Sequence, residues 1–278
     1  IDTLGCTAIG YRALLANTST NYLTAVGFNA MYGNTTGVSG CAFGANALES
    51  NTTGSDNNAF GRGALQENIT GGDNNAFGRL ALNQLTAGIQ NTAMGHAALD
   101  AATTANHNTA FGATTLTDNT TGQYNTAVGS GALADNTTAD YNVAVGYITL
   151  DSNTTGARNC AVGYTAMGLN TTGNYNTAFG SYALADQTTA AFNVAVGYQA
   201  AYNITTGADN TSIGTYSLFD CTNGIRNVAV GYQAAHNLTA SYTTALGYNA
   251  GSTITSGSGN TVIGYNADVA AATNQFSI

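Results

Sequence analysis

A glycine that recurs every 17 residues constrains the fold of this chain more than any other feature. From Gly10 to Gly231 every step is 17 residues, a single step of 16 then leads to Gly247, and a last step of 17 leads to Gly264. Such self-similarity is typical of architectures in which each repeat packs only on its neighbours. Sixteen repeats cover most of the 278 residues, so we expect one domain over 1–278 with repeats from about 6 to 276.

Each repeat contains a short apolar segment just before its glycine. We number the positions so that this glycine is position 5, and Asn125 to Tyr141 are then positions 1 to 17. Position 4 is large and apolar, position 2 is mostly Thr or Val, and position 3 is mostly Ala. Since side chains two apart on a strand share a face, we expect positions 2 and 4 to face the core. Phe111, at position 4, should then be buried, and Phe111→Asp should strongly destabilise the fold.

The alanine column at position 3, together with a second one at position 8, indicates close approach of another surface. Ala127 and Ala132 represent these two columns. A column that stays small in nearly every repeat is constrained in size by its surroundings. Two surroundings fit the pattern, namely a threefold interface between chains or the narrow interior of a single-chain coil.

The recurring glycine predicts a corner that ends the strand, where a Cβ would clash or φ must be positive. Gly112, Gly129, Gly146 and Gly163 are four of these predicted corners. Asn, Thr and Gly, as in the segment NTTG, then close the turn, and they are too frequent for helices. The sequence therefore predicts an all-β parallel β-solenoid, or β-roll, of about sixteen 17-residue turns stacked about 4.8 Å apart.

The strand segments also resemble a known repeat. NTAVG at 125–129, NVAVG at 142–146, 193–197 and 227–231, and NTVIG at 260–264 are similar to the SVAIG-type repeat of the YadA-like head of trimeric autotransporter adhesins. The longer pattern NTAVGYxAL…NTTG resembles repeats of bacterial and viral tail-fibre proteins. The resemblance implies a left-handed β-roll, commonly trimeric, that serves as a surface fibre or adhesive stalk.

Composition excludes several classes of function. Only 7% of residues are charged, the formal net charge is −9, and there are five Lys and Arg, which disfavours binding to nucleic acid or anionic membranes. No run approaches the roughly 20 apolar residues that span a bilayer, so we expect no membrane insertion. The chain starts with Ile and not Met, which fits a processed, exported product. We expect an extracellular, cell-surface or virion location.

No group of residues in the sequence predicts catalysis, a metal site or a cofactor site. The three histidines, His96, His107 and His236, occupy three different repeat positions and read as surface substitutions. Catalysis needs converging groups, such as a nucleophile with a base or paired carboxylates. We therefore expect neither an enzyme nor a bound cofactor.

Several Asn residues begin an N-x-[ST] sequon, which suits a glycan-coated fibre. The alternative is that Asn and Thr form hydrogen-bonded ladders between turns. Asparagines that fit either reading are Asn17, Asn34, Asn51, Asn68, Asn119, Asn136, Asn153, Asn170, Asn203, Asn210 and Asn237.

The cysteines and tyrosines also follow the repeat. Cys41 and Cys160 stand at position 2 and should be small buried hydrophobes, which leaves Cys221 as the expected free or intermolecular thiol. A tyrosine column at position 6 either stacks to stabilise the coil or forms an aromatic strip that binds carbohydrate. Its members are Tyr11, Tyr147, Tyr164, Tyr198, Tyr232, Tyr248 and Tyr265.

Together these features predict a non-enzymatic extracellular fibre or filament subunit. An adhesive role is a further expectation for such a subunit. Its expected partner is itself, in a homotrimer or in a head-to-tail filament through unpaired strand edges at the ends of the coil. A cell-surface glycan is the further expected partner. The alternative class is a glycan-binding or ice-binding solenoid module.

Overall fold

A computed structural model describes residues 5–18, 22–269 and 273–278. Within these residues every regular element is a β-strand, and the predicted all-β parallel β-solenoid of about sixteen turns is confirmed. The chain divides into two compact units, 1–140 and 141–278, which are described separately. The left-handedness and the single domain stay predictions.

Each unit is built from three-residue strands, one in each turn. The strands of the first unit are β1 (Thr7–Ile9), β2 (Thr24–Val26), β3 (Cys41–Phe43), β4 (Asn58–Phe60), β5 (Asn75–Phe77), β6 (Thr92–Met94), β7 (Thr109–Phe111) and β8 (Thr126–Val128). Those of the second unit are β9 (Val143–Val145), β10 (Cys160–Val162), β11 (Thr177–Phe179), β12 (Val194–Val196), β13 (Thr211–Ile213), β14 (Val228–Val230), β15 (Thr244–Leu246), β16 (Thr261–Ile263) and the two-residue β17 (Phe276–Ser277).

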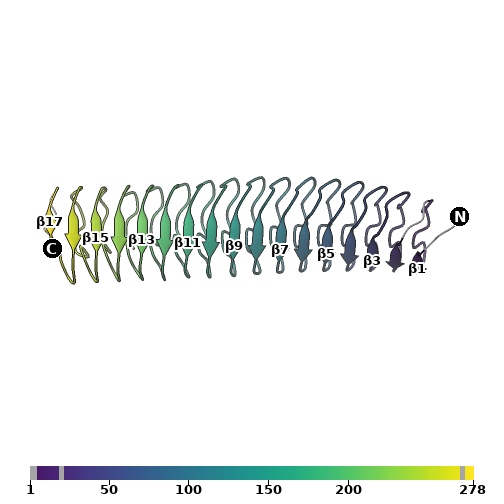
Figure 1. The fold of residues 1–278 in the computed structure, drawn as a ribbon, viewed down its shortest axis with the longest axis horizontal. Coiled ribbons are helices and arrows are strands. Elements are labelled where there is room, and N and C mark those ends of the chain that lie inside the picture. The colour runs from purple at the N-terminus through teal and green to yellow at the C-terminus, as the bar shows by residue number, and fades with distance from the viewer. Residues whose placement is uncertain (1–4, 19–21, 270–272) are drawn as a thin grey trace. The chain divides into compact units, whose positions relative to one another are not determined.

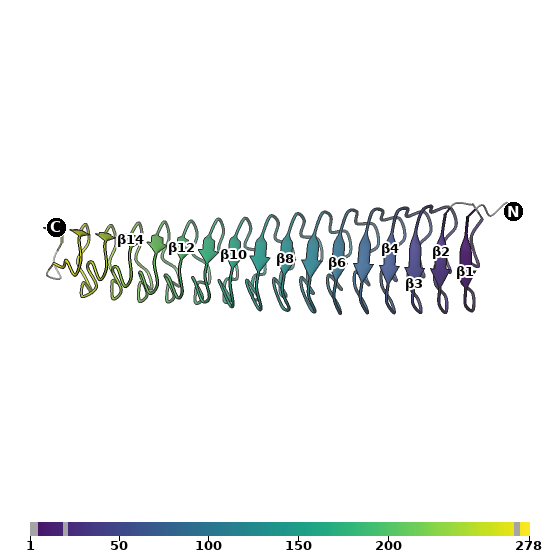
Figure 2. The ribbon, with the colours of Figure 1, turned by 60° about the horizontal axis from the view of Figure 1, so that its bottom comes forward.

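Strands pair in parallel and in sequence order within each unit, as Figures 1 and 2 show. Each residue lies beside its equivalent in the next turn, so that Phe43 pairs with Phe60 and Val194 with Thr211. The 16-residue step keeps this register, because Val228 pairs with Thr244. Side chains at equivalent positions therefore stack upon one another in columns.

The position 5 glycine ends each strand because no other residue fits there. At Gly112, Gly129, Gly146 and Gly163, φ is 141°, 126°, 141° and 138°, a region that L residues rarely adopt. A Cβ on Gly146 would also lie 2.4 Å from the carbonyl oxygen of Gly163 in the next turn. Each corner thus needs both the conformational freedom and the small size of glycine.

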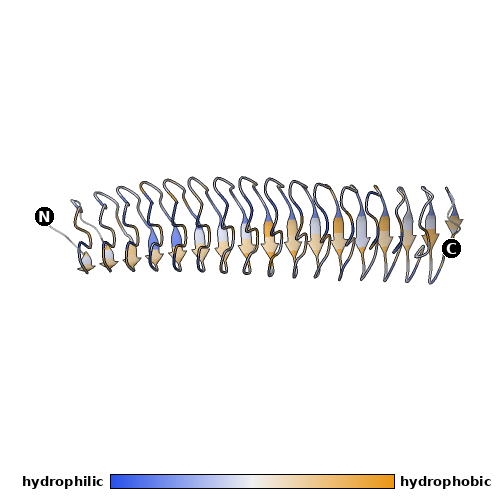
Figure 3. Ribbon diagram, turned by 180° about the vertical axis from the view of Figure 1, so that it is seen from behind, coloured by the Kyte–Doolittle hydropathy of each residue, from blue (hydrophilic) through white to orange (hydrophobic). Residues whose placement is uncertain are grey.

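The strand faces are opposite to the sequence-based expectation. The position 3 alanines from Ala25 onward are fully buried, while Ala8 in the first strand is exposed, and Phe111 at position 4 is 47% exposed. Positions 2 and 4 face outward on every strand of both units, with intermediate to exposed side chains. Figure 3 shows white to orange colour along most strands and blue in β4 and β5, whose first residues are Asn58 and Asn75. The prediction of a buried Phe111 is wrong.

The interior of each turn is narrow and holds small side chains. Ala127 and Ala132 are both fully buried within their own unit, so these columns fill the interior of the coil and line no threefold interface. Position 9 supplies the one large apolar column, mostly Leu, as in Leu65 and Leu133. Burying each such Leu contributes roughly 1.5–3 kcal/mol. Asparagines at positions 1 and 12 complete the interior.

The loop after the corner places non-glycine residues in the left-handed region. Leu133 at position 9 has φ 53°, and its equivalents Leu65 and Leu116 have 51° and 52°. This conformation costs roughly 1–2 kcal/mol for an L residue. Because the loop turns the leucine side chain fully inward, the burial of that side chain offsets the cost.

The repeat continues past the last recognisable motif. Phe276 and Ser277 of β17 pair with Thr261 and Val262 of β16, and Gln275 takes the place of the position 1 asparagine. The backbone N–H of Gln275 accordingly donates to Asn260 Oδ1 at 2.8 Å. This last turn therefore forms strand pairing without a corner glycine.

The buried and exposed strand faces give a direct test. We expect Ala110→Asp to lower the unfolding temperature strongly, because a carboxylate buried without a partner costs several kcal/mol. Phe111→Asp should cost at most about 1 kcal/mol, since it removes only contacts between exposed neighbours. Thermal unfolding followed by circular dichroism measures both changes. A larger loss from Phe111→Asp would contradict the observed orientation of the strands.

Candidate functional site

The asparagines at position 12 form a ladder inside the coil. Asn51 Nδ2 donates to Asn34 Oδ1 at 2.7 Å, which joins two adjacent turns. It also donates to Gly54 O at 2.9 Å, which closes the bend within its own turn. The same pattern recurs at Asn136 and Asn170. Most of these buried amide groups are thereby paired in a medium where an unpaired polar group is costly, and Asn68 Oδ1 is an exception. The ladder reading of the NTT segments is confirmed.

A second ladder runs along position 1. Asn210 donates from its backbone N–H and from Nδ2 to Asn193 Oδ1, at 2.9 and 3.1 Å. Nδ2 of Asn210 also donates to Gly224 O at 2.8 Å. The position 1 side chain thus accepts from the next turn and donates across its own interior. These contacts explain why a buried position is polar.

The threonines at position 13 form a ladder at the edge of the turn. Thr52 Oγ1 donates to Ile69 O at 2.9 Å, and Thr86 Oγ1 donates to Thr103 O at 3.0 Å. Their hydroxyls therefore satisfy backbone carbonyls of the following turn. The hydrogens of the position 13 hydroxyls are therefore bonded within the protein and are not available to a flat external ligand such as ice.

The structure divides the candidate glycosylation sites by burial. The side chain of Asn237 is exposed, and those of Asn17 and Asn203 are half-buried. Glycosylation of these three asparagines stays a prediction. The remaining sequon asparagines are almost completely buried, and a glycan on Nδ2 is incompatible with their position inside the coil. They are Asn34, Asn51, Asn68, Asn119, Asn136, Asn153, Asn170 and Asn210.

The outward strand face is the most extensive candidate interaction surface. Large apolar side chains at position 4 form one exposed column in each unit, including Phe111 in the first and Phe179, which is 56% exposed, in the second. Phe60 stacks between Phe43 and Phe77, with ring centroids 4.9 and 4.8 Å apart. Position 2 adds a parallel column of mostly Thr and Val. This face can bind an apolar partner surface.

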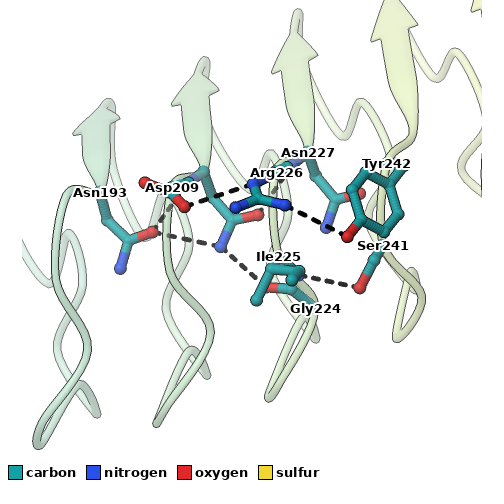
Figure 4. A network of polar contacts seen from close by, with 9 residues as sticks. Asn193, Asp209, Gly224, Ile225, Arg226, Asn227, Ser241 and Tyr242 are labelled. Carbon is teal, nitrogen blue, oxygen red and sulfur yellow. Dashed lines mark hydrogen bonds and ion pairs between the residues drawn. The ribbon is translucent and has the colours of Figure 1, made fainter.

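A ladder of aromatic and charged side chains occupies position 17. Arg158 lies between Tyr141 and Tyr175, with its guanidinium 5.3 and 5.4 Å from the two ring centroids. Arg226 pairs with Asp209 at 3.5 Å and donates to the Tyr242 hydroxyl at 3.3 Å (Figure 4). Both arginines of the second unit are therefore engaged with partners in adjacent turns.

The cysteines lie opposite to the sequence-based expectation. Cys41 and Cys160 point outward at position 2 and are half-buried, whereas Cys221 replaces a ladder asparagine and is fully buried. Burial raises the pKa of the Cys221 thiol to about 11. Cys221 is a free cysteine, as expected, but an intermolecular thiol at this position is excluded because its side chain faces the interior.

The titratable groups stay dispersed over the surface. Burial raises the pKa of Asp100, and His96 nearby partly counteracts this shift. In the part of the chain that the structure describes, no three His, Cys, Asp or Glu side chains gather as a metal-binding set. Among the same residues, no helix is long and apolar enough to cross a membrane.

The geometry defines a parallel β-solenoid repeat protein with polar ladders inside and an apolar strand face outside. Comparison with protein-family models and with curated proteins finds no match. The proposals below therefore depend on the surfaces of the chain.

Two neighbouring asparagines test the ladders. Asn74→Leu should destabilise the protein by about 1–3 kcal/mol for each group it leaves unpaired, because Gly88 O and the Asn91 N–H both lose their contact with this side chain. Asn68→Leu should cost less, since it leaves Asn51 Oδ1 as the one group that loses its partner. Asn68 Oδ1 itself has no partner among the described residues, and Gly71 O keeps its bond from Asn57. Urea unfolding measures both, and equal losses would contradict these roles.

The reactivity of Cys221 tests whether the side chain at position 12 is buried. We expect iodoacetamide at pH 8 to leave Cys221 unmodified in the folded protein, because the thiol is buried and its pKa lies well above this pH. After unfolding in urea, Cys221 should react like any free cysteine. Mass spectrometry of the alkylated peptides measures the extent of reaction, and rapid modification in the folded state would show that the side chain faces outward.

Proposed function

We propose that this chain is a non-enzymatic structural element of an extracellular fibre, in which copies associate side by side through the outward strand face. The observation that carries the proposal is the column of large apolar side chains at position 4. Every turn adds one member to the column, and Phe111, Phe179 and Ile213 are among those that stay exposed in the single chain. Soluble monomers rarely expose apolar patches of more than a few hundred Å².

The shape of this face suits another copy of the same chain. In-register pairing makes each column straight, and the stacked rings of Phe43, Phe60 and Phe77 are within 7° of parallel. A flat sheet face of this kind packs against a second sheet about 10 Å away. Lateral association through equivalent faces forms a closed assembly, of which the homotrimer is the form implied by the resemblance to adhesin heads.

The internal ladders support a structural role. The Asn columns at positions 1 and 12 and the Thr column at position 13 direct their polar groups to the adjacent turn. Such side chains stabilise stacking and leave few convergent polar groups for chemistry. Surface fibres, tail-fibre shafts and adhesins require this kind of repetitive, self-supporting architecture.

Sedimentation measurements on the purified chain test the assembly. We expect a defined oligomer, and the resemblance to adhesin heads favours a trimer. Replacing Phe43, Phe60 and Phe77 together by Ser should shift the protein toward monomers, because the substitutions remove the apolar column from three adjacent turns. Thermal unfolding should change little, since the position 4 side chains lie outside the core.

A matched control uses an exposed stacked pair elsewhere. Tyr175 and Phe192 stack at 5.1 Å in position 17, and replacing both by Ser should leave the oligomer intact. A wild-type chain that remains monomeric at millimolar concentration would overturn the proposal. Particles that lengthen with concentration even in the Phe-to-Ser variant would instead indicate head-to-tail association through strand edges.

A further inference from the structure

The second unit carries a continuous surface of aromatic rings on the loop after the corner glycine. One row crosses five successive turns through Tyr164, Tyr182, Tyr198, Tyr216 and Tyr232, with adjacent centroids 5.1, 6.4, 5.5 and 6.2 Å apart. A second row at position 10 stacks Tyr202 on Phe219 and Phe219 on His236, at 5.3 and 5.1 Å. Tyr216 joins the rows, because it lies 5.8 Å from Phe219. We call these two rows the aromatic patch.

The first row is maintained by complementary substitutions. Tyr164, Tyr198 and Tyr232 occupy position 6, whereas Ser181 and Thr215 occupy position 6 in the turns between them. In those two turns the tyrosine stands at position 7 instead, as Tyr182 and Tyr216, and its ring meets the neighbouring rings edge to face. Each of the five turns thus contributes one ring to the row, although the ring comes from position 6 in three turns and from position 7 in the other two.

The fold itself does not require this row. Apart from Tyr11 and Phe28, which stack at 5.5 Å, and His96, the first unit builds the same turns with Ala45, Arg62, Arg79, Ala113 and Ser130 at position 6. Its strands pair in the same register, and its leucine column is equally buried. Rings in the second unit therefore serve a purpose other than stacking the turns.

The chemistry of the patch favours a polar ligand with apolar faces. Most of its members are tyrosines, which combine a flat ring with a hydroxyl group, and Tyr164 and Tyr198 are each 44% exposed. Amide and carboxylate groups follow the second row in the chain. Asn203 Nδ2 donates to Asp220 Oδ1 at 2.7 Å, and the Asn237 amide oxygen lies 3.0 Å from His236 Nδ1. Such groups can hydrogen-bond to hydroxyls at the edge of the rings.

The charges beside the patch select against anionic ligands. The two arginines of the second unit, Arg158 and Arg226, belong to the position 17 ladder, where each already contacts tyrosine rings. Asp186 and Asp220 border the second row, because their backbone N–H groups donate to the carbonyl oxygens of Tyr202 and His236. A carboxylate or sulfate on a ligand would therefore meet acidic side chains without a free arginine to pair with it.

We infer that the aromatic patch binds a neutral glycan, whose pyranose rings lie across successive turns and pack on the tyrosine rings. Pyranose rings have apolar C–H faces that pack on aromatic rings and equatorial hydroxyls that reach the surrounding amides and carboxylates. Because the rows repeat from turn to turn, a linear chain of sugars contacts several rings at once, and affinity rises with chain length. This binding site lies on side chains other than those of the proposed assembly surface.

Titration calorimetry of the full chain with neutral hexasaccharides tests the inference. The probes are cellohexaose, chitohexaose and maltohexaose, with the matching disaccharides and a heparin-derived hexasaccharide for comparison. We expect at least one neutral hexasaccharide to bind at least tenfold more tightly than its disaccharide, and the anionic probe not to bind. The protein lacks Trp, so a change in tyrosine fluorescence reports contact with the rings directly.

Variants locate the site. Tyr198→Ala should weaken binding of the neutral hexasaccharide at least tenfold, and Tyr198→Phe should weaken it less, because the ring is kept. Tyr175→Ala removes an equally exposed stacked tyrosine outside the patch and should leave affinity unchanged. Unfolding temperatures and sedimentation of the same variants verify that the fold and the oligomer persist.

Two outcomes would overturn the inference: none of the three neutral hexasaccharides binds, or Tyr175→Ala weakens binding as much as Tyr198→Ala. A fall in oligomer mass for Tyr198→Ala would also overturn it and assign the patch to contacts between copies. Failure of the assembly proposal is distinguishable, because the Phe43, Phe60 and Phe77 substitutions should leave glycan binding in place.

Discussion

Hydrogen bonds between residues one turn apart determine the rest of this structure. Asn58 N–H donates to Asn74 O at 2.8 Å and Leu65 N–H donates to Ala81 O at 3.0 Å, and most backbone groups of a turn are satisfied in this way. Within a turn the backbone closes on itself only at a few tight bends, such as Asn68 N–H to Leu65 O. A turn therefore has little stability alone, and each must match the hydrogen-bonding geometry of the next. The strict 17-residue period follows from this requirement.

Stacking also decides which side chains can lie inside. A Cβ at Gly146 would approach the next turn to 2.4 Å, so the corner admits only glycine, and the adjacent interior column admits little more than alanine. The leucine at position 9 is the exception, since its left-handed loop turns the side chain into the remaining space. Asparagine fits the rest because its amide bonds to the same amide one turn away. Size and hydrogen bonding thus select the interior more strongly than hydrophobicity does.

This selection explains what the sequence could and could not predict. The period, the parallel stacking, the corner glycines and the asparagine ladders follow from repetition and from the chemistry of Gly and Asn. The facing of the strands was predicted wrongly, because the hydrophobicity of Phe111 was given more weight than the uniformly small column to which Ala110 belongs. The left-handed Leu133 and the strand at Phe276 were missed because neither a glycine nor the motif marks them. The aromatic patch was only partly visible, since its row alternates between two positions.

The outward positions are free to carry function because the stacking leaves them unconstrained. Where the chain loses one residue, between Gly231 and Gly247, the strands on either side remain in register. Ala240 still accepts from Asn227 Nδ2, so the missing residue belongs to the exposed part of the turn just before it. A solenoid that tolerates a deletion there also tolerates changes of chemistry on its loops. The two units use the same interior to present different surfaces, with alanine, arginine and serine in one and rows of tyrosine in the other. Differences between surfaces on an identical scaffold are therefore the part of this sequence most directly related to binding.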